Sequence, residues 1–257
     1  MNYNIEKPKV NYPSGLTGKL PAHFDPTILP DPTTGFILGL VGSRGCGKSA
    51  LLYNILTKFY KGCFDRVYIF NPSYGNDPTL SPESLGLPEE SFLTNIDTDF
   101  IEQILQEQID EKRDYDKQPV GKRKKKNLSR ILFVFDDCIS DPSFSSNRNT
   151  NVMNALGFRG RHYRINTIIT SQFLGAISRR LRCNIPNWML FNTDNGKEIK
   201  ILREEMGGTC NEDAFERMYR QATAEPYNFF MIYGTCPNKE MKFRRNLDNI
   251  LEYNYQK

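Results

Sequence analysis

The sequence predicts an α/β fold in which helices cover both faces of a mainly parallel central sheet. Short apolar segments of strand length alternate along the chain with segments whose apolar residues recur at helical spacing. One such strand leads through a glycine-rich turn into a helix, and another runs directly into two adjacent aspartates. Because parallel strands deliver polar side chains to one edge of a sheet, these two features are expected to meet there. The length of 257 residues suits one large α/β domain or two small ones.

The chain begins with a proline-rich segment, residues 1–35, which holds six prolines and shows little apolar periodicity. Proline restricts the backbone to extended conformations and cannot donate a backbone hydrogen bond. We therefore predict an extended arm over residues 1–35, lying on the domain or on a neighbouring subunit. Residues 36–257 are predicted to form one folded domain.

A phosphate-binding loop is predicted at the start of that domain. Residues 36–41 form the apolar run of a buried strand, and residues 49–60 place apolar side chains on one helical face. Between them, residues 42–49 read GSRGCGKS and match the pattern G-x-x-x-x-G-K-[ST] at every fixed position. The alternative is a glycine-rich turn with an incidental Lys-Ser, but strand, loop and helix in this order favour a nucleotide triphosphate site.

Each kind of residue in this loop has a part in binding phosphate. Glycines let the backbone turn tightly and approach phosphate oxygens, and amides at the helix start attract the anion. Lys48 is expected to reach the β- and γ-phosphates, and the Ser49 hydroxyl to ligate Mg²⁺. The predicted ATP-binding residues are Gly42, Ser43, Arg44, Gly45, Cys46, Gly47, Lys48, Ser49 and Ala50.

A strand at residues 66–70, a loop at 71–91 and a helix at 99–111 are predicted next. The polar stretch at residues 114–127 ends in five consecutive basic side chains. Close to duplex DNA, such a run would bind phosphates without regard to sequence. Charge runs are more often solvated loops, and a nuclear localisation signal is a third interpretation. The candidate DNA contacts are Lys122, Arg123, Lys124, Lys125 and Lys126.

The apolar strand predicted at residues 131–135 runs directly into Asp136-Asp137. At the carboxyl end of a parallel strand, Asp136 is placed to hold the metal, directly or through water. Asp137 is expected to polarise the attacking water as a general base. Alone, this pair would more often be an acidic turn; the phosphate loop upstream favours the catalytic interpretation.

A third polar element, Thr170-Ser171-Gln172, ends the strand predicted at residues 167–170. These polar residues end the strand next to the one that leads into Asp136-Asp137, and from there they can reach a γ-phosphate. Gln172 is therefore expected to orient water or to sense hydrolysis. The alternative is a polar loop that caps the strand.

Negative charge at the transition state requires an arginine. Arg44 lies within the loop and would act in its own chain, whereas Arg159 and Arg161 follow a helix predicted at residues 149–158 and would reach a neighbour's ATP. We favour Arg159 or Arg161 acting on a neighbour; surface or phosphate pairing is the alternative. A third source is the helix that carries Arg179, Arg180 and Arg182.

The remaining chain continues the alternation of strands and helices. The predicted elements are a strand at 188–191, helices at 197–206 and 213–222 separated by Gly207-Gly208, a strand at 227–233, and a returning segment at 241–245.

Composition excludes several classes of protein. The net charge of +4 permits nucleic-acid binding without requiring it. The six cysteines lack C-x-x-C spacing, which argues against a zinc site or a disulfide framework and favours a reducing compartment. Residues 1–13 are too polar for a signal peptide, and no apolar run approaches the length of a membrane span. We therefore expect neither secretion nor membrane insertion.

Three segments in this order, GSRGCGKS, ILFVFDD and RGRHYRINTIITSQ, give the chain a resemblance to a known family. It resembles the viral genome-packaging ATPases of the poxvirus A32 type, found in large DNA viruses and virophages. These belong to the FtsK/HerA superfamily of RecA-like (ASCE) P-loop NTPases. The resemblance covers roughly residues 36–245, and its third segment is the most specific.

The resemblance implies an ATP- and Mg²⁺-dependent motor that moves double-stranded DNA into a preformed capsid. It implies a homo-oligomeric ring, a pentamer or hexamer, at a portal or capsid vertex, working in viral factories of the host cytoplasm and in the virion. The loop residues, Asp136, Asp137 and Gln172 carry over as binding, metal, base and sensor residues. Arg44 departs from the simplest family pattern and resembles the loop arginine of tailed-phage terminase motors.

Three other functions share parts of this chemistry. A related translocase would act on cellular or plasmid DNA, and a small-molecule phosphotransferase would close its arginines over a substrate. A non-catalytic nucleotide switch is disfavoured because the Asp-Asp pair suits hydrolysis. A guanine switch also requires N-K-x-D, and residues 238–241 lack the final aspartate.

Overall fold

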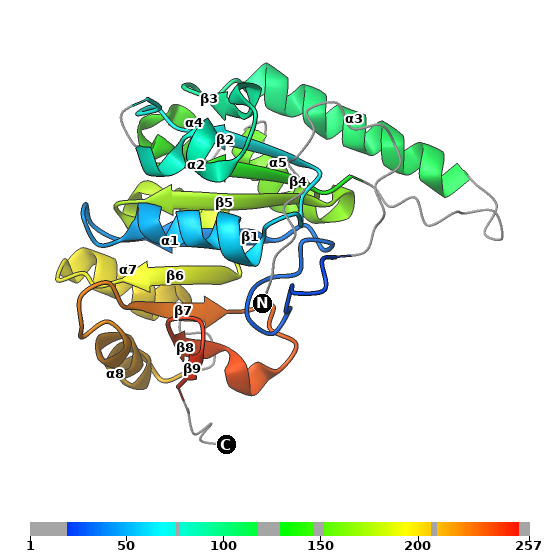
Figure 1. Cartoon of the computed structure of the whole chain (residues 1–257). Coiled ribbons are helices and arrows are strands. Elements are labelled where there is room, and N and C mark those ends of the chain that lie inside the picture. Colours follow the sequence, from blue (N-terminus) through cyan, green and yellow to red (C-terminus); the bar gives the residue numbers. More distant parts are fainter. Residues whose placement is uncertain (1–19, 76–77, 118–128, 146–151, 207–209, 252–257) are drawn as a thin grey trace.

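The computed structural model describes residues 20–75, 78–117, 129–145, 152–206 and 210–251 (Figure 1). The basic run at residues 122–126 and the Gly207-Gly208 stop lie outside these residues, as does the start of the helix predicted at 149–158.

A nine-stranded sheet in the order β3-β2-β4-β5-β1-β6-β7-β8-β9 forms the centre of the molecule (Figure 1). The pairs from β3 through β6 are parallel, whereas β6 to β9 pair antiparallel. The predicted mainly parallel α/β class is therefore confirmed. The strands are β1 (Ile37–Val41), β2 (Arg66–Phe70), β3 (Phe92–Leu93), β4 (Ile131–Phe135), β5 (Ile165–Ser171), β6 (Asn187–Phe191), β7 (Phe229–Tyr233), β8 (Phe243–Arg245) and β9 (Asn249–Ile250).

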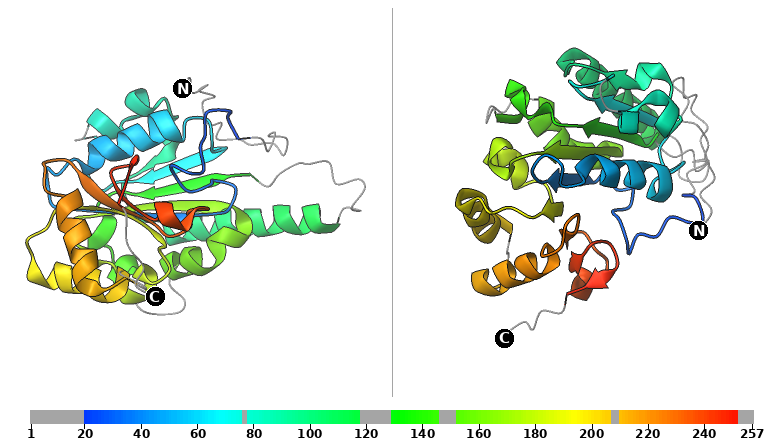
Figure 2. Two further views of the ribbon diagram at one scale, coloured as in Figure 1. Left: turned by 90° about the horizontal axis from the view of Figure 1, so that it is seen from below. Right: turned by 60° about the vertical axis from the view of Figure 1, so that its left-hand side comes forward.

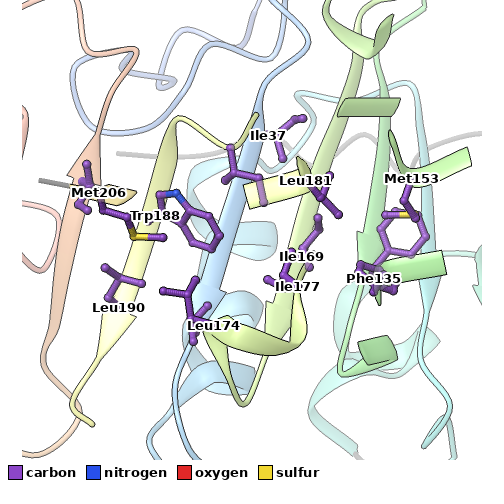
Figure 3. Packing of buried hydrophobic residues seen from close by; sticks show 14 of the residues in the cluster. Ile37, Phe135, Met153, Ile169, Leu174, Ile177, Leu181, Trp188, Leu190 and Met206 are labelled. Carbon is purple, nitrogen blue, oxygen red and sulfur yellow. The ribbon is translucent and has the colours of Figure 1, made fainter. Parts of the chain in front are cut away.

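Helices cover both faces of this sheet, as Figures 1 and 2 show. The face that carries α1 also receives residues 24–36 and buries Leu52, Ile55 and Tyr60. The opposite face carries α3, α5, α6, α7 and α8, and its core extends along the sheet from Phe135 to Met206 (Figure 3). The α-helices are α1 (Lys48–Asn54), α2 (Pro82–Leu85), α3 (Thr98–Lys117), α4 (Pro142–Ser145), α5 (Val152–Arg159), α6 (Arg179–Arg182), α7 (Gly196–Met206) and α8 (Glu212–Ala222).

The proline-rich segment, where it is described, is bound to the domain of its own chain. The Tyr60 hydroxyl donates to the Pro30 carbonyl at 2.7 Å, and the Tyr233 hydroxyl donates to the Pro26 carbonyl at 2.6 Å. The Asn166 side-chain amide donates to the Pro32 carbonyl at 3.0 Å, and Leu29 is buried. Residues 26–32 therefore close one end of the core through carbonyls that no helix or strand uses.

Besides shifts of one or two residues at the ends of strands, three elements differ from the sequence-based expectation. The helix predicted at 49–60 changes after α1 into a π-helix, Ile55–Phe59, whose wider turn lets the Tyr60 ring stack on Phe24 and Phe36. The helix predicted at 99–111 extends to Lys117, where charge pairs three and four residues apart support the polar turns.

The third difference is in the predicted loop at residues 71–91, which contains α2 and the short 3₁₀ helices Pro78–Leu80 and Glu89–Ser91. The Ser81 side chain caps α2 by accepting from the Ser84 N–H at 3.2 Å. The next two residues, Phe92–Leu93, add β3 to the edge of β2. Such short elements lack the periodicity by which longer helices and strands are predicted.

No helix among the residues that the structure describes combines the length and apolar character needed to cross a membrane.

Candidate nucleotide site

The phosphate loop and the acidic pair lie at the same edge of the sheet, separated by one strand. β5 pairs with β1 on one side and with β4 on the other. The Gly42 N–H, where the loop begins, donates to the Ser171 carbonyl at 3.1 Å. Since adjacent strands are about 4.8 Å apart, the loop and Asp136 start roughly 10 Å from each other. A triphosphate bound by the loop would therefore lie within reach of the acidic pair.

The glycines give the loop a backbone shape that other residues do not adopt readily. Gly45 and Gly47 have positive φ angles of 77° and 105°. A Cβ at Gly42 would lie 2.6 Å from the Cβ of Phe191 and 2.7 Å from the sulfur of Cys46. No side chain caps the start of α1, so its first amides face a position where an anion would take the place of a cap.

Lys48 is buried beneath the loop, 7% exposed. Its ammonium donates to the Gly42 carbonyl at 2.6 Å and to the Ser43 carbonyl at 3.1 Å. These bonds hold the charge at the concave side of the loop, close to where phosphate oxygens would sit. Ser43, Arg44, Gly45 and Ala50 are exposed, whereas Ser49 is half-buried at the helix start.

Asp136 is buried and held on both carboxylate oxygens. The Thr170 hydroxyl donates to Oδ1 at 2.7 Å, and the side-chain amide of Asn71 donates to Oδ2 at 3.1 Å. Asn71 directly follows β2 and Thr170 is the penultimate residue of β5, and these two strands flank β4. The carboxylate is thus oriented by its neighbours, as a metal-binding carboxylate is.

Asp137 adopts a left-handed backbone conformation with φ of 49°, which is uncommon for a residue other than glycine. Its N–H donates to the Thr170 hydroxyl at 3.0 Å, and its Oδ2 accepts from the Gln172 amide at 3.3 Å. Within the described part of the chain, its Oδ1 is buried without a hydrogen-bond partner. A buried carboxylate oxygen of this kind requires water or a cation.

The donors at this edge fit Mg²⁺, which prefers oxygen ligands and keeps several waters. Ser49 and Asp136 would supply oxygen ligands, and Asp137, whose Oδ1 has no partner in the described residues, follows Asp136 directly. In the described ranges, no group of three or more His, Cys, Asp or Glu side chains is placed to hold a metal. A divalent ion here would therefore complete its coordination with phosphate oxygens and water.

The Cys46 thiol lies within electrostatic range of both halves of the site. Burial raises the pKa of Cys46; the positive charge of Lys48 opposes this shift, and the negative charge of Asp137 adds to it. The thiol therefore stays protonated and neutral at physiological pH, and it packs beneath the loop without competing for the cation.

The candidate arginines lie in different places. Arg44 is exposed on the loop itself. Arg159 and Arg161 are exposed at the amino end of β5, next to Gly35, which precedes β1. The seven residues of β5 separate them from the loop of their own chain by about 20 Å. They are therefore able to serve only the site of another copy.

Arg182, from the third candidate group, has a structural role. It is buried, pairs with both carboxylate oxygens of Glu205 at 2.8 Å, and donates to the carbonyls of Leu174 and Ile177. Its guanidinium is fully used in joining α6 to α7. Arg179 is exposed and lies 3.5 Å from the same glutamate.

The sequence did not identify Asn71 as a site residue, and it placed Thr170 in the third polar element without predicting its contacts with the acidic pair. Asn71 was interpreted only as the turn after strand 66–70, yet it donates to Asp136. The Thr170 hydroxyl bonds both Asp136 and the backbone of Asp137. Both residues occupy the position where a parallel strand ends, and that shared position is the sequence feature that could have identified them.

The family model described as Poxvirus A32 protein matches residues 23–236 of this chain. No curated protein matches it in sequence.

Several solved structures share the fold. The DNA-packaging ATPase B204 from Sulfolobus Turreted Icosahedral Virus has a TM-score of 0.59 at 12% identity, covering 85% of this chain and all of that one. The genome packaging NTPase B204 from Sulfolobus turreted icosahedral virus 2, solved with ATP-gammaS, has a TM-score of 0.54 at 15% identity, over 84% and 98% of the chains. The pCW3 conjugation coupling protein TcpA has a TM-score of 0.54 at 17% identity, over 78% and 58%.

Proposed function

The chain belongs to the Poxvirus A32 protein family, and from this premise we propose that it is an ATP-hydrolysing motor that moves double-stranded viral DNA into a preformed capsid. The observation that carries the proposal is the arrangement across β5, which holds the phosphate loop on one side and Asp136-Asp137 on the other. The fold shared with viral packaging ATPases supports it.

In this proposal the phosphate loop binds the triphosphate through its backbone amides and Lys48. The ammonium moves from the Gly42 and Ser43 carbonyls to the β- and γ-phosphates when nucleotide enters. Ser49 and Asp136 would hold Mg²⁺. When bound, this ion neutralises charge on the phosphates and fixes their geometry.

Asp137 accepts a proton from the attacking water. Its Oδ2 is held by Gln172, which leaves the unpartnered Oδ1 to accept a hydrogen bond from that water. Gln172 itself orients the water. Because Gln172 follows β5, it also makes the end of this strand sensitive to whether the γ-phosphate is present. Thr170 bonds the Asp136 carboxylate and the backbone N–H of Asp137, and thereby fixes the position of the residue that would hold the metal relative to the base.

An arginine neutralises the charge that develops on the γ-phosphate, an effect of roughly 10³ to 10⁵ in rate. Arg159 or Arg161 supplies it from a neighbouring subunit of a homo-oligomeric ring, a pentamer or hexamer. Arg44 is the alternative, acting within its own chain. Duplex DNA binds by sequence-independent phosphate contacts, for which residues 122–126 remain the candidates outside the described residues. We propose that the ring acts at a capsid vertex, in the host cytoplasm and the virion.

A triplex-displacement assay tests translocation directly. A third strand bound at the far end of linear duplex DNA should be released when the protein and ATP are present, and retained with a non-hydrolysable analogue. Lys48→Ala should abolish release, whereas Lys58→Ala, which removes an exposed lysine from the adjoining π-helix, should preserve it.

Two results would point to other functions. ATP turnover without displacement, together with phosphate transfer to a small acceptor, would indicate a phosphotransferase. Displacement that added capsid proteins do not change would fit a translocase for non-viral DNA.

A further inference from the structure

Tyr227 presents an aromatic ring beside the phosphate loop. Its side chain is 73% exposed, the largest exposed fraction among the large hydrophobic residues of the described chain. A Cβ placed on Gly47 would lie 3.3 Å from Cδ1 of Tyr227, so the ring stands against the backbone of the loop. The Phe191 ring also lies near the same glycine, with Cε1 at 3.8 Å from that position.

The backbone of Tyr227 is held in a conformation that tyrosine rarely adopts, with φ of 68°. The strand predicted at residues 227–233 begins two residues later for this reason. The next residue, Asn228, donates through its N–H to the Glu225 carbonyl at 3.3 Å and accepts from the Asn246 amide at 2.9 Å. Asn246 also accepts from the Phe229 N–H at 3.1 Å. Strained conformations that are fixed by their surroundings are concentrated at functional sites.

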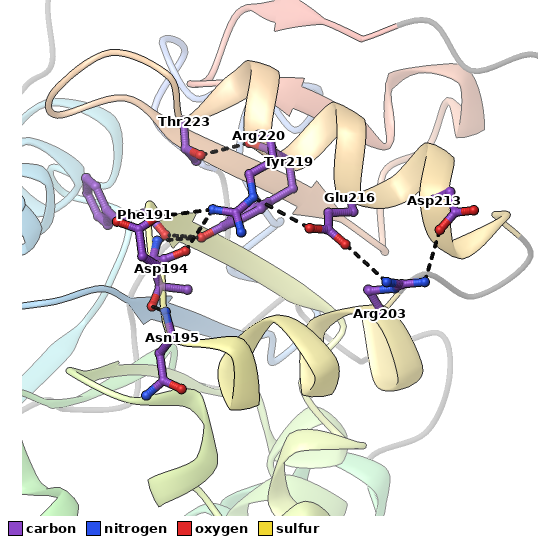
Figure 4. Close-up of polar contacts among 10 residues, drawn as sticks. Phe191, Asp194, Asn195, Arg203, Asp213, Glu216, Tyr219, Arg220 and Thr223 are labelled. Carbon is purple, nitrogen blue, oxygen red and sulfur yellow. Dashed lines mark hydrogen bonds and ion pairs between the residues drawn. The ribbon is translucent and has the colours of Figure 1, made fainter.

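The helix before Tyr227 is tied to the strand beside the loop. The Tyr219 hydroxyl donates to the Phe191 carbonyl at 2.7 Å and accepts from the Thr193 N–H at 2.9 Å (Figure 4). Arg220 adds a bond to the Thr193 carbonyl at 3.0 Å. These contacts fix the carboxyl end of α8 against the end of β6, which neighbours β1. The helix that leads to Tyr227 is therefore held in place beside the loop.

We propose that Tyr227 is the platform on which the base of the bound nucleotide stacks. The inference rests on the proposed triphosphate site and extends it to the other end of the ligand. A nucleotide bound by the loop has its base attached through the ribose, so an exposed aromatic ring in contact with that loop lies within its range. A tyrosine on a constrained backbone has few torsions left to order when the base stacks on it.

Stacking predicts a particular kind of specificity. Every base has an aromatic face, and larger bases cover more of the ring. The site should therefore prefer purine to pyrimidine nucleotides and discriminate only weakly between ATP and GTP. Tripolyphosphate, which has no base, should bind independently of Tyr227.

The test measures the binding of ATP, CTP and tripolyphosphate to Tyr227→Asn and Tyr227→Phe by calorimetry. Asparagine tolerates the positive φ and removes the ring, so backbone strain is not introduced. Tyr227→Asn should weaken ATP binding about tenfold and leave tripolyphosphate binding unchanged, whereas Tyr227→Phe should bind like the wild type. Phe158→Ala, which removes another exposed ring at the end of α5, is the control and should change neither.

Unchanged ATP binding in Tyr227→Asn would overturn the stacking role. Equal losses of ATP and tripolyphosphate binding would overturn it too, because they would show that Tyr227 stabilises the phosphate loop and does not contact the base. An exposed ring used instead for contact between subunits would give unchanged ATP binding together with a changed oligomeric state. If the wild type bound neither ATP nor tripolyphosphate, the triphosphate site itself would fail, and the platform with it.

Discussion

The hydroxyl of Thr170 donates to Oδ1 of Asp136 at 2.7 Å, across the boundary between two neighbouring strands. The same oxygen accepts the N–H of Asp137 at 3.0 Å. One side chain therefore orients the proposed metal ligand and the proposed base together. Because β5 also receives the first amide of the phosphate loop, it joins the two halves of the site.

Thr170→Val should weaken Mg²⁺-dependent turnover about 10- to 100-fold, because it removes the hydrogen bonds that orient Asp136 and Asp137. A titration of ATPase rate against Mg²⁺ should show a higher half-saturating concentration. Thr167→Val makes the same change in the buried middle of β5, away from Asp136, and should leave the titration unchanged. Equal effects of the two variants would show that Thr170 only packs.

Mixed oligomers should identify the arginine. Arg159→Ala or Arg161→Ala subunits retain Lys48, and Lys48→Ala subunits retain both arginines, so each variant should be inactive alone. If the arginine acts on a neighbour, a random equal mixture should recover about a quarter of wild-type turnover, because half of the intact loops face an intact arginine. If neither mixture recovers activity while Arg44→Ala is inactive, Arg44 is the residue that acts.

Gly39→Ala should destabilise the fold by about 1–3 kcal/mol, because a Cβ at this position in β1 would overlap the indole of Trp188 on β6. The free energy of unfolding in urea measures this cost. Gly196→Ala, at the start of α7, meets no atom within 4 Å and should be neutral or slightly stabilising. No loss in Gly39→Ala would show that the β1–β6 contact adjusts easily.

The protein should lose stability in alkaline solution. Burial raises the pKa of Cys63, Cys138 and Tyr219 to about 12. In the unfolded chain they ionise near their ordinary values, 9.0 for cysteine and 10.0 for tyrosine. Their contribution is therefore complete below about pH 9 and declines as pH rises toward about 12.

Urea midpoints measured between pH 7 and 11 test this expectation. Cys63→Ala removes one of the buried groups and should make the alkaline decline shallower. Cys183→Ala removes an exposed thiol and should leave the slope as it is. A wild-type midpoint that stays constant above pH 9 would contradict the expected linkage.

The sequence was most informative where an apolar strand pattern leads directly into polar residues of the site. The strands at residues 66–70 and 131–135 were predicted to the residue, because continuous apolar runs bounded by polar residues suit strands buried on both faces. The loop, the acidic pair and Gln172 were predicted to share one edge, and the structure places them there because β5 separates β1 from β4.

What the sequence did not predict depends on contacts between distant segments. The π-helix after α1 accommodates Tyr60, whose partners lie in residues 24–36. Asn71 and Tyr227 gain their positions at the site only when β2 is placed beside β4 and α8 is tied to β6. Local propensity carries no information about such neighbours.

Duplex-dependent ATP turnover tests the central claim most directly. We expect the rate of ATP hydrolysis to rise several-fold when linear double-stranded DNA is added, and the stimulation to decline with increasing salt as phosphate contacts weaken. Lys48→Ala should remove both basal and stimulated turnover, and Asp137→Asn should lose turnover by about 10²- to 10⁴-fold while still binding ATP. Identical rates with and without duplex DNA, at every salt concentration, would contradict the assignment of this chain as a DNA motor.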